Sequence, residues 1–199
     1  MTNFADPVVL EGPHVRLELL SIDHLEMLCE VGLDPVLWEK AIAPLQTEKD
    51  MRRYIHTALE WHVQGTALPF VIIDKSSASV VGSTRYANID QSNRRLEIGW
   101  TWVARAWQRT HVNTEAKFLL LRHAFEELGC IRVEFKTDSL NTRSRAALLR
   151  IGAKEEGTLR NHMIIHDGRI RHSVYFSIVE TEWPDAKQRL STFLAGGQG

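Results

Sequence analysis

Glu97 is the first residue whose type and setting suit chemistry. It lies in the segment RLEIGWTWV (95–103), where apolar residues alternate with polar or small ones: Leu96, Ile98 and Trp100 against Glu97, Gly99 and Thr101. In a strand, this alternation turns the Glu97 carboxylate away from the layer of Leu96 and Ile98, where it could take a proton from a reacting group. A solvated glutamate on a strand is an equally simple interpretation.

The segment QRTHVN, from Gln108 to Asn113, is the second candidate. It connects the strand that ends near Val103 with a helix expected to begin near Thr114. Free backbone N–H groups and the helix dipole make such a helix start a binding place for phosphate. The alternative is an ordinary loop in which Asn113 or Thr114 caps the helix.

Asn141 and Ser144 form the third candidate pair. Asn141 stands at the start of a predicted helix, where its side chain is a good cap, and Ser144 follows one turn later. The Ser144 hydroxyl could donate a proton to a leaving group, or simply face solvent. Arg143 and Arg145 could reach phosphate groups, although arginines on an exposed helix face are usually solvated.

No metal site is expected from the remaining residues that commonly bind metals. Cys29 and Cys130 belong to no zinc-binding spacing. His162 and His166 are four residues apart, but they fall on a predicted strand rather than on a helix.

The hydrophobic pattern predicts the scaffold that positions these candidates. Period-two segments predict strands at 14–19, 69–74, 80–89, 95–103, 131–137, 154–165 and 170–179. Helical spacing with caps or glycine stops predicts helices at 21–32, 47–65, 114–128, 141–151 and 183–193. This order predicts an α+β fold with a mixed sheet, in which strands 95–103 and 131–137 run parallel through a crossover helix.

Composition limits the class of protein. The chain has 199 residues, 44% hydrophobic and 25% charged, with a formal net charge of -1. These values predict one globular domain over 1–199, with a core at about 8–184 and a C-terminal tail at 185–199, and they argue against a nucleic-acid binder. No segment is apolar enough to span a bilayer, and the start is not typical of a signal peptide. We therefore expect a cytoplasmic protein with reduced cysteines.

Four segments, taken together and in order, resemble the GCN5-related N-acetyltransferase (GNAT) superfamily, and within it the ribosomal-protein-alanine N-acetyltransferase group. They are RLEIGWTWVARAWQRTHVNTEAK (95–117), the segment 119–157, LRNHM (159–163) and HDGRIRHSVYFSIVETEWP (166–184). The resemblance extends from about Val8 to Trp183. It implies a mixed, mostly antiparallel twisted sheet of about six to seven strands with helices on both faces.

The resemblance also implies the roles of the site residues. Acetyl-CoA would be the co-substrate, without a metal, and the superfamily's pyrophosphate loop would comprise Gln108, Arg109, Thr110, His111, Val112, Asn113 and Thr114. His111 and Asn113 replace the small residues usual in that loop, and we expect the left-handed tolerance of asparagine to make Asn113 the milder change. The backbone of Trp102 and Val103 would lie at the acyl group, where an N–H donor stabilises developing negative charge.

The remaining implied roles concern proton transfer and CoA. Asn141 and Ser144 would contact CoA, with Ser144 protonating the leaving thiolate. Glu97 would act as general base, directly or through water, for the attacking amine. The side chains of Trp100 and Trp102 have packing as their simple alternative.

On the acceptor side, the resemblance implies a strand with Arg160, Asn161 and His162 beside the substrate. His172 stands where the family often has an acidic residue after a second arginine, which puts a shared ion pair of Arg169 or Arg171 in doubt. Two tryptophans, Trp38 and Trp61, could line an amine pocket or belong to the core.

The function implied is transfer of an acetyl group from acetyl-CoA to a primary amine by direct attack in a ternary complex. The acceptor would be a ribosomal or other protein N-terminus or a small amine, and the enzyme a homodimer without membrane or nucleic-acid partners. A CoA-binding sensor or interaction protein, a scaffold without CoA binding, and a succinyl-type N-acyltransferase are the alternatives.

Overall fold

One mixed sheet organises the chain in the computed structural model, which describes residues 3–39 and 41–196. Its eight strands lie in the order β1-β2-β3-β4-β5-β6-β8-β7. They are β1 (Leu10–Glu11), β2 (Val15–Leu19), β3 (Leu68–Asp74), β4 (Ser79–Asp90), β5 (Arg95–Val103), β6 (Arg132–Asp138), β7 (Lys154–Ile164) and β8 (Ile170–Val179). The short β1 is the strand that the sequence pattern did not predict. The predicted α+β class, the antiparallel meander β3-β4-β5 and the parallel pair β5 and β6 are confirmed.

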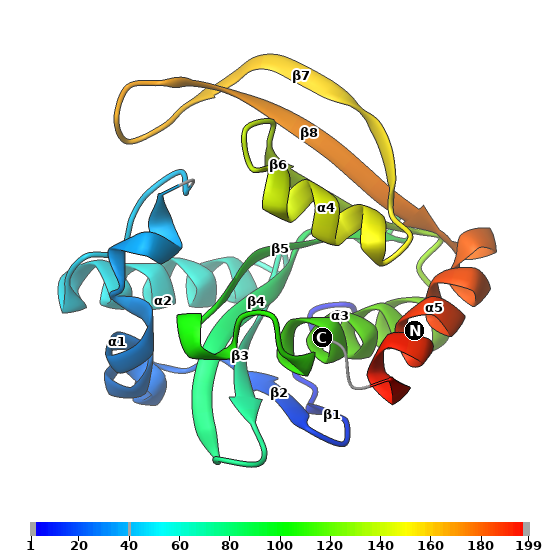
Figure 1. Ribbon diagram of the computed structural model, residues 1–199, viewed down its shortest axis with the longest axis horizontal. Helices are drawn as coiled ribbons and strands as arrows, with labels where there is room; N and C mark the ends of the chain where they lie inside the picture. The colour runs from blue at the N-terminus through cyan, green and yellow to red at the C-terminus, as the bar shows by residue number, and fades with distance from the viewer. Residues whose placement is uncertain (1–2, 40, 197–199) are drawn as a thin grey trace.

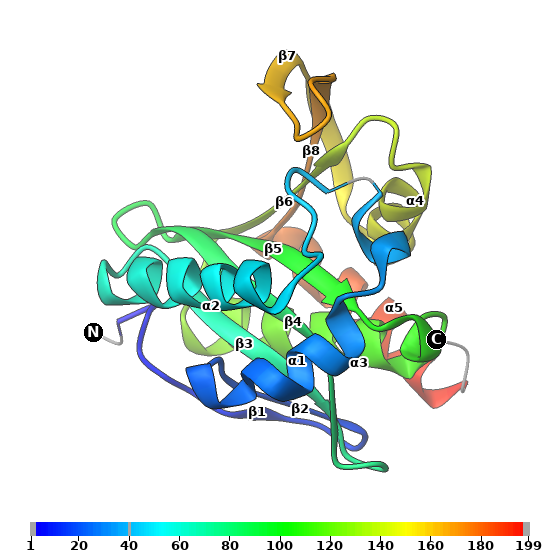
Figure 2. The ribbon, with the colours of Figure 1, turned by 90° about the vertical axis from the view of Figure 1, so that its left-hand side faces the viewer.

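Helices cover both faces of the sheet, as Figures 1 and 2 show. They are α1 (Leu25–Gly32), α2 (Glu48–Val63), α3 (His111–Arg122), α4 (Thr142–Arg150) and α5 (Trp183–Ala195). The core on one face includes residues of α3 and α5. A second core on the other face joins α1 and α2 to β3, β4 and β5. The β7–β8 hairpin projects away from the rest of the molecule (Figure 1).

Local sequence explains the start of α2. Thr47 and Asp50 form a reciprocal cap, in which the Thr47 hydroxyl accepts from Asp50 N–H and the Asp50 carboxylate accepts from Thr47 N–H. Met51, Ile55 and Ala58 then recur at helical spacing and are buried against the sheet.

The helix ends differ from the predicted bounds, and the change at the start of α3 matters most for the site. The predicted helix 114–128 begins three residues earlier, at His111, because the Thr110 hydroxyl accepts from Val112 N–H at 3.3 Å and caps it. After Arg122 it continues as a π-helical turn, His123–Glu127. The core also extends beyond residue 184, since Ala186 and Leu190 of α5 are buried in it.

The two parallel strands diverge after a short contact. β5 and β6 pair only from Arg95 with Arg132 to Glu97 with Glu134. The later residues of β5, 98–103, have no partner on the β6 side, so part of their backbone polar groups is left for other partners.

β5 also contains a bulge on its β4 side. Gly99 is opposite Arg85, and Trp102 is opposite Ser83, so β5 has one residue more than β4 between these pairs. Trp100 adopts a left-handed backbone with φ of 50°. This bulge breaks the alternation assumed from the sequence, and the Trp100 side chain lies on the Glu97 face rather than with Leu96 and Ile98.

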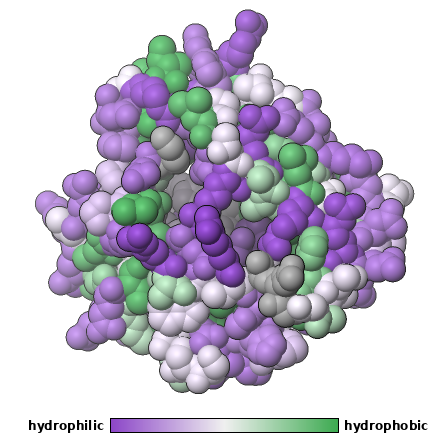
Figure 3. Space-filling view, in the orientation of Figure 1, coloured by the Kyte–Doolittle hydropathy of each residue, from purple (hydrophilic) through white to green (hydrophobic). Residues whose placement is uncertain are grey.

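The surface is mixed in character. On the face in Figure 3, hydrophobic residues form small patches among hydrophilic ones. Within residues 3–39 and 41–196, no helix is both long and apolar enough to cross a membrane.

Candidate active site

The helix starts of α3 and α4 meet beside the unpaired end of β5. The Arg143 guanidinium of α4 donates to Gln108 Oε1 at 2.8 Å, and Gln108 Nε2 donates to the Val103 carbonyl at 2.9 Å. Gln108 therefore links the end of β5 to the first turn of α4. Tertiary structure thus brings together Val103, Gln108 and Arg143, which are separate in the sequence.

The start of α3 offers the features that a polyphosphate requires. Arg109 has a left-handed backbone with φ of 62°, and its exposed side chain lies beside the Thr110 cap. The first-turn N–H groups of a helix lack intrahelical acceptors and are at the positive end of its dipole. Together with Arg143, this helix end is suited to bind an anionic group such as a phosphate.

His111 and Asn113 occupy different places from those expected. His111 is the first residue of α3, and its ring turns toward β3, with Nε2 at 3.7 Å from Asp74 Oδ1 and its centroid at 4.6 Å from that of His14. Asn113 lies in the first helical turn rather than in a left-handed loop, and neither it nor Thr114 caps the helix. The substitution of the small residues therefore alters the side chains around the helix start without preventing the helix from beginning there.

Glu97 lies on the face that the alternation predicts, but it is buried rather than solvated. Its side chain is 3% exposed, and Oε2 accepts from Asn88 Nδ2 at 2.7 Å and from Lys136 Nζ at 3.4 Å. Oε1 has no hydrogen bond among the described residues. It lies over Gly99, where an added Cβ would approach it to 2.9 Å. Glycine at 99 thus leaves room for a carboxylate oxygen beside the bulge.

Tryptophan side chains in β5 and α2 have separate surroundings. Trp102 packs on Trp38, with centroids 5.6 Å apart, in the core under α1 and α2. Trp100 meets Trp61 edge-on at 5.4 Å. Packing is therefore the role of the Trp38 and Trp102 rings, whereas Trp61 and Trp100 line a cavity of about 290 Å³.

Asn141 and Ser144 are adjacent at the start of α4. Asn141 Oδ1 accepts from Ser144 N–H at 3.0 Å, which confirms the predicted cap. The half-buried Ser144 hydroxyl has no hydrogen-bond partner among the described residues. It remains available as a donor next to Arg143.

The β7–β8 hairpin forms one ion pair in the region where the sequence left an ion pair in doubt. Arg169 pairs with the buried Asp138 of β6 at 2.5 Å, so the acidic partner comes from another strand. His172 Nδ1 instead accepts from Asn161 N–H at 2.8 Å, and Arg171 donates to Ser173 Oγ at 3.1 Å.

The hairpin turn also meets the loop that precedes α2. His166 N–H donates to the Ile42 carbonyl at 3.1 Å. This contact joins two segments far apart in the chain on the α2 side of the diverging strands (Figure 1).

Sequence reasoning missed three residues near Glu97, which are Asn88, Lys136 and Arg85, and it missed Lys117 on the opposite face of the sheet. Lys117 of α3 donates to Thr101 Oγ1 at 3.2 Å, behind the bulge, and burial lowers its pKa from 10.5 to about 8. A lysine in an otherwise apolar helix face was the available signal for Lys117. The others lie on strands whose register the sequence does not give.

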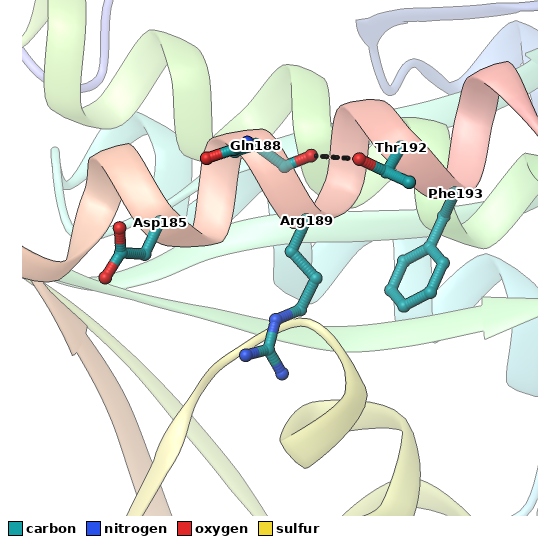
Figure 4. Close-up of a pocket in the computed structure, with 5 residues that line it drawn as sticks. All are labelled: Asp185, Gln188, Arg189, Thr192 and Phe193. Atoms are coloured by element: carbon teal, nitrogen blue, oxygen red, sulfur yellow. Dashed lines mark hydrogen bonds between the residues drawn. The ribbon is translucent and has the colours of Figure 1, made fainter.

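A larger hollow, of about 440 Å³, lies on the surface of α5, away from this site. Its lining comes from a single helix: Asp185, Gln188, Arg189, Thr192 and Phe193 (Figure 4). The Thr192 hydroxyl donates to the Gln188 carbonyl at 2.9 Å, which is an ordinary helix contact. The described residues contain no group of three or more histidine, cysteine, aspartate or glutamate side chains that could hold a metal ion.

Comparison with known proteins gives the family. Residues 14–154 match the model of the acetyltransferase (GNAT) domain. The crystal structure of a GCN5-related N-acetyltransferase from Brucella melitensis has a TM-score of 0.88 and 30% identity, covering 97% of this chain and 90% of that one. The chain therefore belongs to the GNAT family of acetyltransferases, which confirms the expected fold and enzyme class.

Relatives with more specific names are similar over different lengths. The provisionally named ribosomal N-acetyltransferase YdaF of Bacillus subtilis is 37% identical over 109 residues, which are 55% of this chain and 58% of that protein. The chain is 24% identical over 125 residues to the [Ribosomal protein uS5]-alanine N-acetyltransferase of Escherichia coli, covering 62% and 63%. Mycobacterium smegmatis RimJ, in complex with CoA-disulfide, has a TM-score of 0.79 at 25% identity, covering 98% and 97%.

Proposed function

We propose that this protein transfers the acetyl group of acetyl-CoA to a primary amine, by direct attack of the amine within a ternary complex. The observation that carries the proposal is the position of Glu97 Oε1. This unbonded carboxylate oxygen lies over Gly99, next to the bulge and at the point where β5 and β6 diverge. Acetyl-CoA, when bound, would supply an acetyl group activated as a thioester.

One end of the site would bind the polyphosphate of acetyl-CoA, and the other end would hold the acyl group and the reacting atoms. The first turn of α3, Arg109 and Arg143 would hold the polyphosphate. Backbone N–H groups of Trp102 or Val103 would donate to the acyl oxygen as negative charge develops on it. Asn141 would order the start of α4, so that the Ser144 hydroxyl can give a proton to the departing sulfur.

Glu97 would take the proton of the attacking amine, directly or through one water. Asn88 and Lys136 would hold its other oxygen and so orient the carboxylate. Neither cysteine is assigned a covalent role: Cys130 is buried, and burial raises the pKa of its thiol to about 12.

A protein N-terminus is the acceptor that the relatives' names favour, because two of them are named for ribosomal proteins. An α-amino group has a pKa of about 8, against about 10.4 for lysine, so it needs less help to become neutral. A homodimer and a cytoplasmic location belong to the same proposal and derive from the family resemblance.

The test is release of free CoA from acetyl-CoA with an alanine-initiated peptide, alongside the same peptide blocked at its N-terminus but carrying a lysine. Transfer to the free N-terminus, located by mass spectrometry, is expected. Tight calorimetric binding of acetyl-CoA without transfer to any amine would favour the sensor alternative, and a preference for succinyl-CoA would change the acyl group. Failure to bind either thioester would overturn the proposal.

Ser144→Ala tests the proposed proton donor. We expect kcat to fall about tenfold, because a thiolate with a pKa near ~8.5 leaves without full protonation. The dissociation constant of CoA, measured by calorimetry, should stay within about twofold. An equal loss in both quantities would make Ser144 a binding residue instead.

A further inference from the structure

Arg85 of β4 is a buried charge without a hydrogen-bond or ion-pair partner among the described residues. The residue is 1% exposed, and both Nε and Nη2 are buried without an acceptor. A buried charge normally has a partner, because its loss of hydration is costly. The Arg85 guanidinium therefore requires an explanation that the proposed mechanism does not give.

Aromatic rings surround this guanidinium. Its central carbon is 4.7 Å from the ring centroid of Tyr54, 5.4 Å from Trp61 and 5.2 Å from Trp100. Ring faces stabilise a cation, but they accept no strong hydrogen bonds. The cage holds the positive charge in place and leaves the N–H groups of Nε and Nη2 unsatisfied.

The two unpartnered nitrogens form one edge of the guanidinium. Nε and Nη2 point in the same direction, in the spacing that suits the two oxygens of a carboxylate. A carboxylate at this edge would satisfy both donors and neutralise the charge at once.

Arg85 lies close to the place where the amine would react, because it is diagonal to Glu97 on the same face of the sheet. Arg85 is opposite Gly99 of β5, and Glu97, two residues before Gly99, is opposite Ala87. Residues diagonal to each other on one face of a sheet are ~7–8 Å apart. An acceptor with its amine at Glu97 could therefore place a nearby carboxylate at Arg85.

A cavity is lined by residues that contact each of these two groups. Trp61 and Trp100, two walls of the Arg85 cage, also line the cavity of about 290 Å³, together with Ala87 and Asn88. Asn88 is the residue that holds Glu97. The guanidinium thus lies directly behind the wall formed by the two tryptophans.

We propose that Arg85 binds a carboxylate of the acceptor, which enters from the cavity as the Trp61 and Trp100 rings move apart, and so selects amines that carry an anionic group close to the nitrogen. This inference rests on the proposed acetyl transfer and narrows its acceptor. The carboxylate has two sources, the α-carboxylate of a free amino acid or an acidic side chain near a peptide N-terminus.

Paired acceptors that differ only in this charge test the proposal. One pair is alanine and alaninamide, compared at equal fractions of neutral amine. The other pair is an Ala-Glu peptide and the corresponding Ala-Gln peptide with amidated C-termini. For at least one of these pairs, kcat/KM of the wild type should be about 10- to 100-fold higher for the acceptor that carries the carboxylate. This is the factor expected for a hydrogen bond between charged groups. The pair that shows the preference identifies the source.

Arg85→Met should reduce this ratio to about one, and Arg85→Lys should retain part of it, which also provides a result if the methionine variant folds poorly. A purely structural Arg85 would lower kcat/KM equally for both members of a pair and leave the ratio unchanged. Arg122→Met is the matched control. Its guanidinium lies over Phe118, at 5.6 Å, on α3 at the opposite face of the sheet, so the ratio should stay as in the wild type.

Calorimetric titration of the CoA-loaded protein with the same pairs separates the two proposals. Transfer without a carboxylate preference, or a ratio that survives Arg85→Met, would overturn the anion site and leave acetyl transfer intact. Binding that depends on both the carboxylate and Arg85, without transfer to any acceptor, would retain the anion site and reject the proposed function. Absence of both binding and transfer would reject both.

Discussion

The two faces of β5 carry opposite kinds of residues. On one face, Leu96 and Ile98 are buried in the core that includes Leu119 and Leu120 of α3. On the other face, Glu97 is buried with one carboxylate oxygen unpaired, close to the unpartnered Arg85 of β4. The first face contributes apolar burial, and the second holds polar groups whose bonding is incomplete. Such incomplete bonding costs stability and is expected where a ligand completes it.

Among variants on the two faces of β5, Glu97→Gln should have the largest effect, and we expect this effect on the rate of acetyl transfer. Removing a general base lowers turnover by about 10²- to 10⁴-fold at neutral pH. The loss should shrink as pH rises above ~8, because the acceptor α-amine then loses its proton without help. A pH series of kcat/KM measures this.

Glu134→Gln is the control for that experiment. Glu134 is the register partner of Glu97 on β6, but its carboxylate is paired with Arg95 and Arg132. Its replacement should leave the pH profile unchanged. Equal rates for wild type and Glu97→Gln at every pH would remove Glu97 from the mechanism.

Leu96→Ala tests the other face of the same strand, one residue away. Truncation of a buried leucine should lower the free energy of unfolding by about 2–5 kcal/mol, through lost burial and a residual cavity. Urea denaturation measures this loss, with Leu159→Ala on the exposed strand β7 as a control expected to change stability by less than ~0.5 kcal/mol. Equal losses for the two variants would contradict the assignment of Leu96 to the core.

Lys117→Met should raise stability at neutral pH by up to about 3 kcal/mol, because burial lowers the lysine pKa from 10.5 to about 8, and each unit corresponds to ~1.36 kcal/mol. The penalty on the folded wild type is complete below pH 8 and is relieved as pH rises toward 10.5, where the unfolded state also loses the proton. The advantage of the variant should therefore shrink from pH 7 to pH 10 in urea denaturation.

The exposed Lys49→Met, on α2, is the control for the lysine experiment and should show no such trend. A constant difference between Lys117→Met and the wild type from pH 7 to pH 10 would contradict a lowered Lys117 pKa. Lost stability at every pH would show that the bond to Thr101 outweighs the burial of the charge.

His111→Ala should have the smallest effect. Its imidazole lies beside Asp74, away from Arg143, so CoA affinity should change by less than about threefold. Stability should fall by less than ~1 kcal/mol, because the imidazole is partly exposed and its contact with Asp74 is long, at 3.7 Å. Calorimetry with CoA measures the affinity, and His56→Ala on α2 serves as a surface control. A large loss of affinity confined to His111→Ala would mean that this ring contacts the nucleotide.

Much of the scaffold is readable from local sequence. The seven predicted strands and the five predicted helices are present, with shifts at their ends. Two helix caps were also predictable, because the residues of each cap are close in the sequence. They are Thr47 with Asp50 and Asn141 with Ser144. For the candidate site, the sequence named Gln108, Val103 and Arg143 but not the hydrogen bonds that join them, and it did not give the orientation of His111.

What the sequence alone determined is the order and type of the elements, the family, and the face of β5 that holds Glu97, because side-chain alternation is a property of neighbouring residues. Only the tertiary structure decided that Trp100 changes face at a bulge. It also decided that Asn88 and Lys136 hold the Glu97 carboxylate. The ring cage around Arg85, formed by Tyr54, Trp61 and Trp100, is a third feature of this kind. These contacts join residues far apart in the chain, and they depend on strand register and on where two parallel strands stop pairing. No local pattern specifies either, because both follow from how the whole sheet packs.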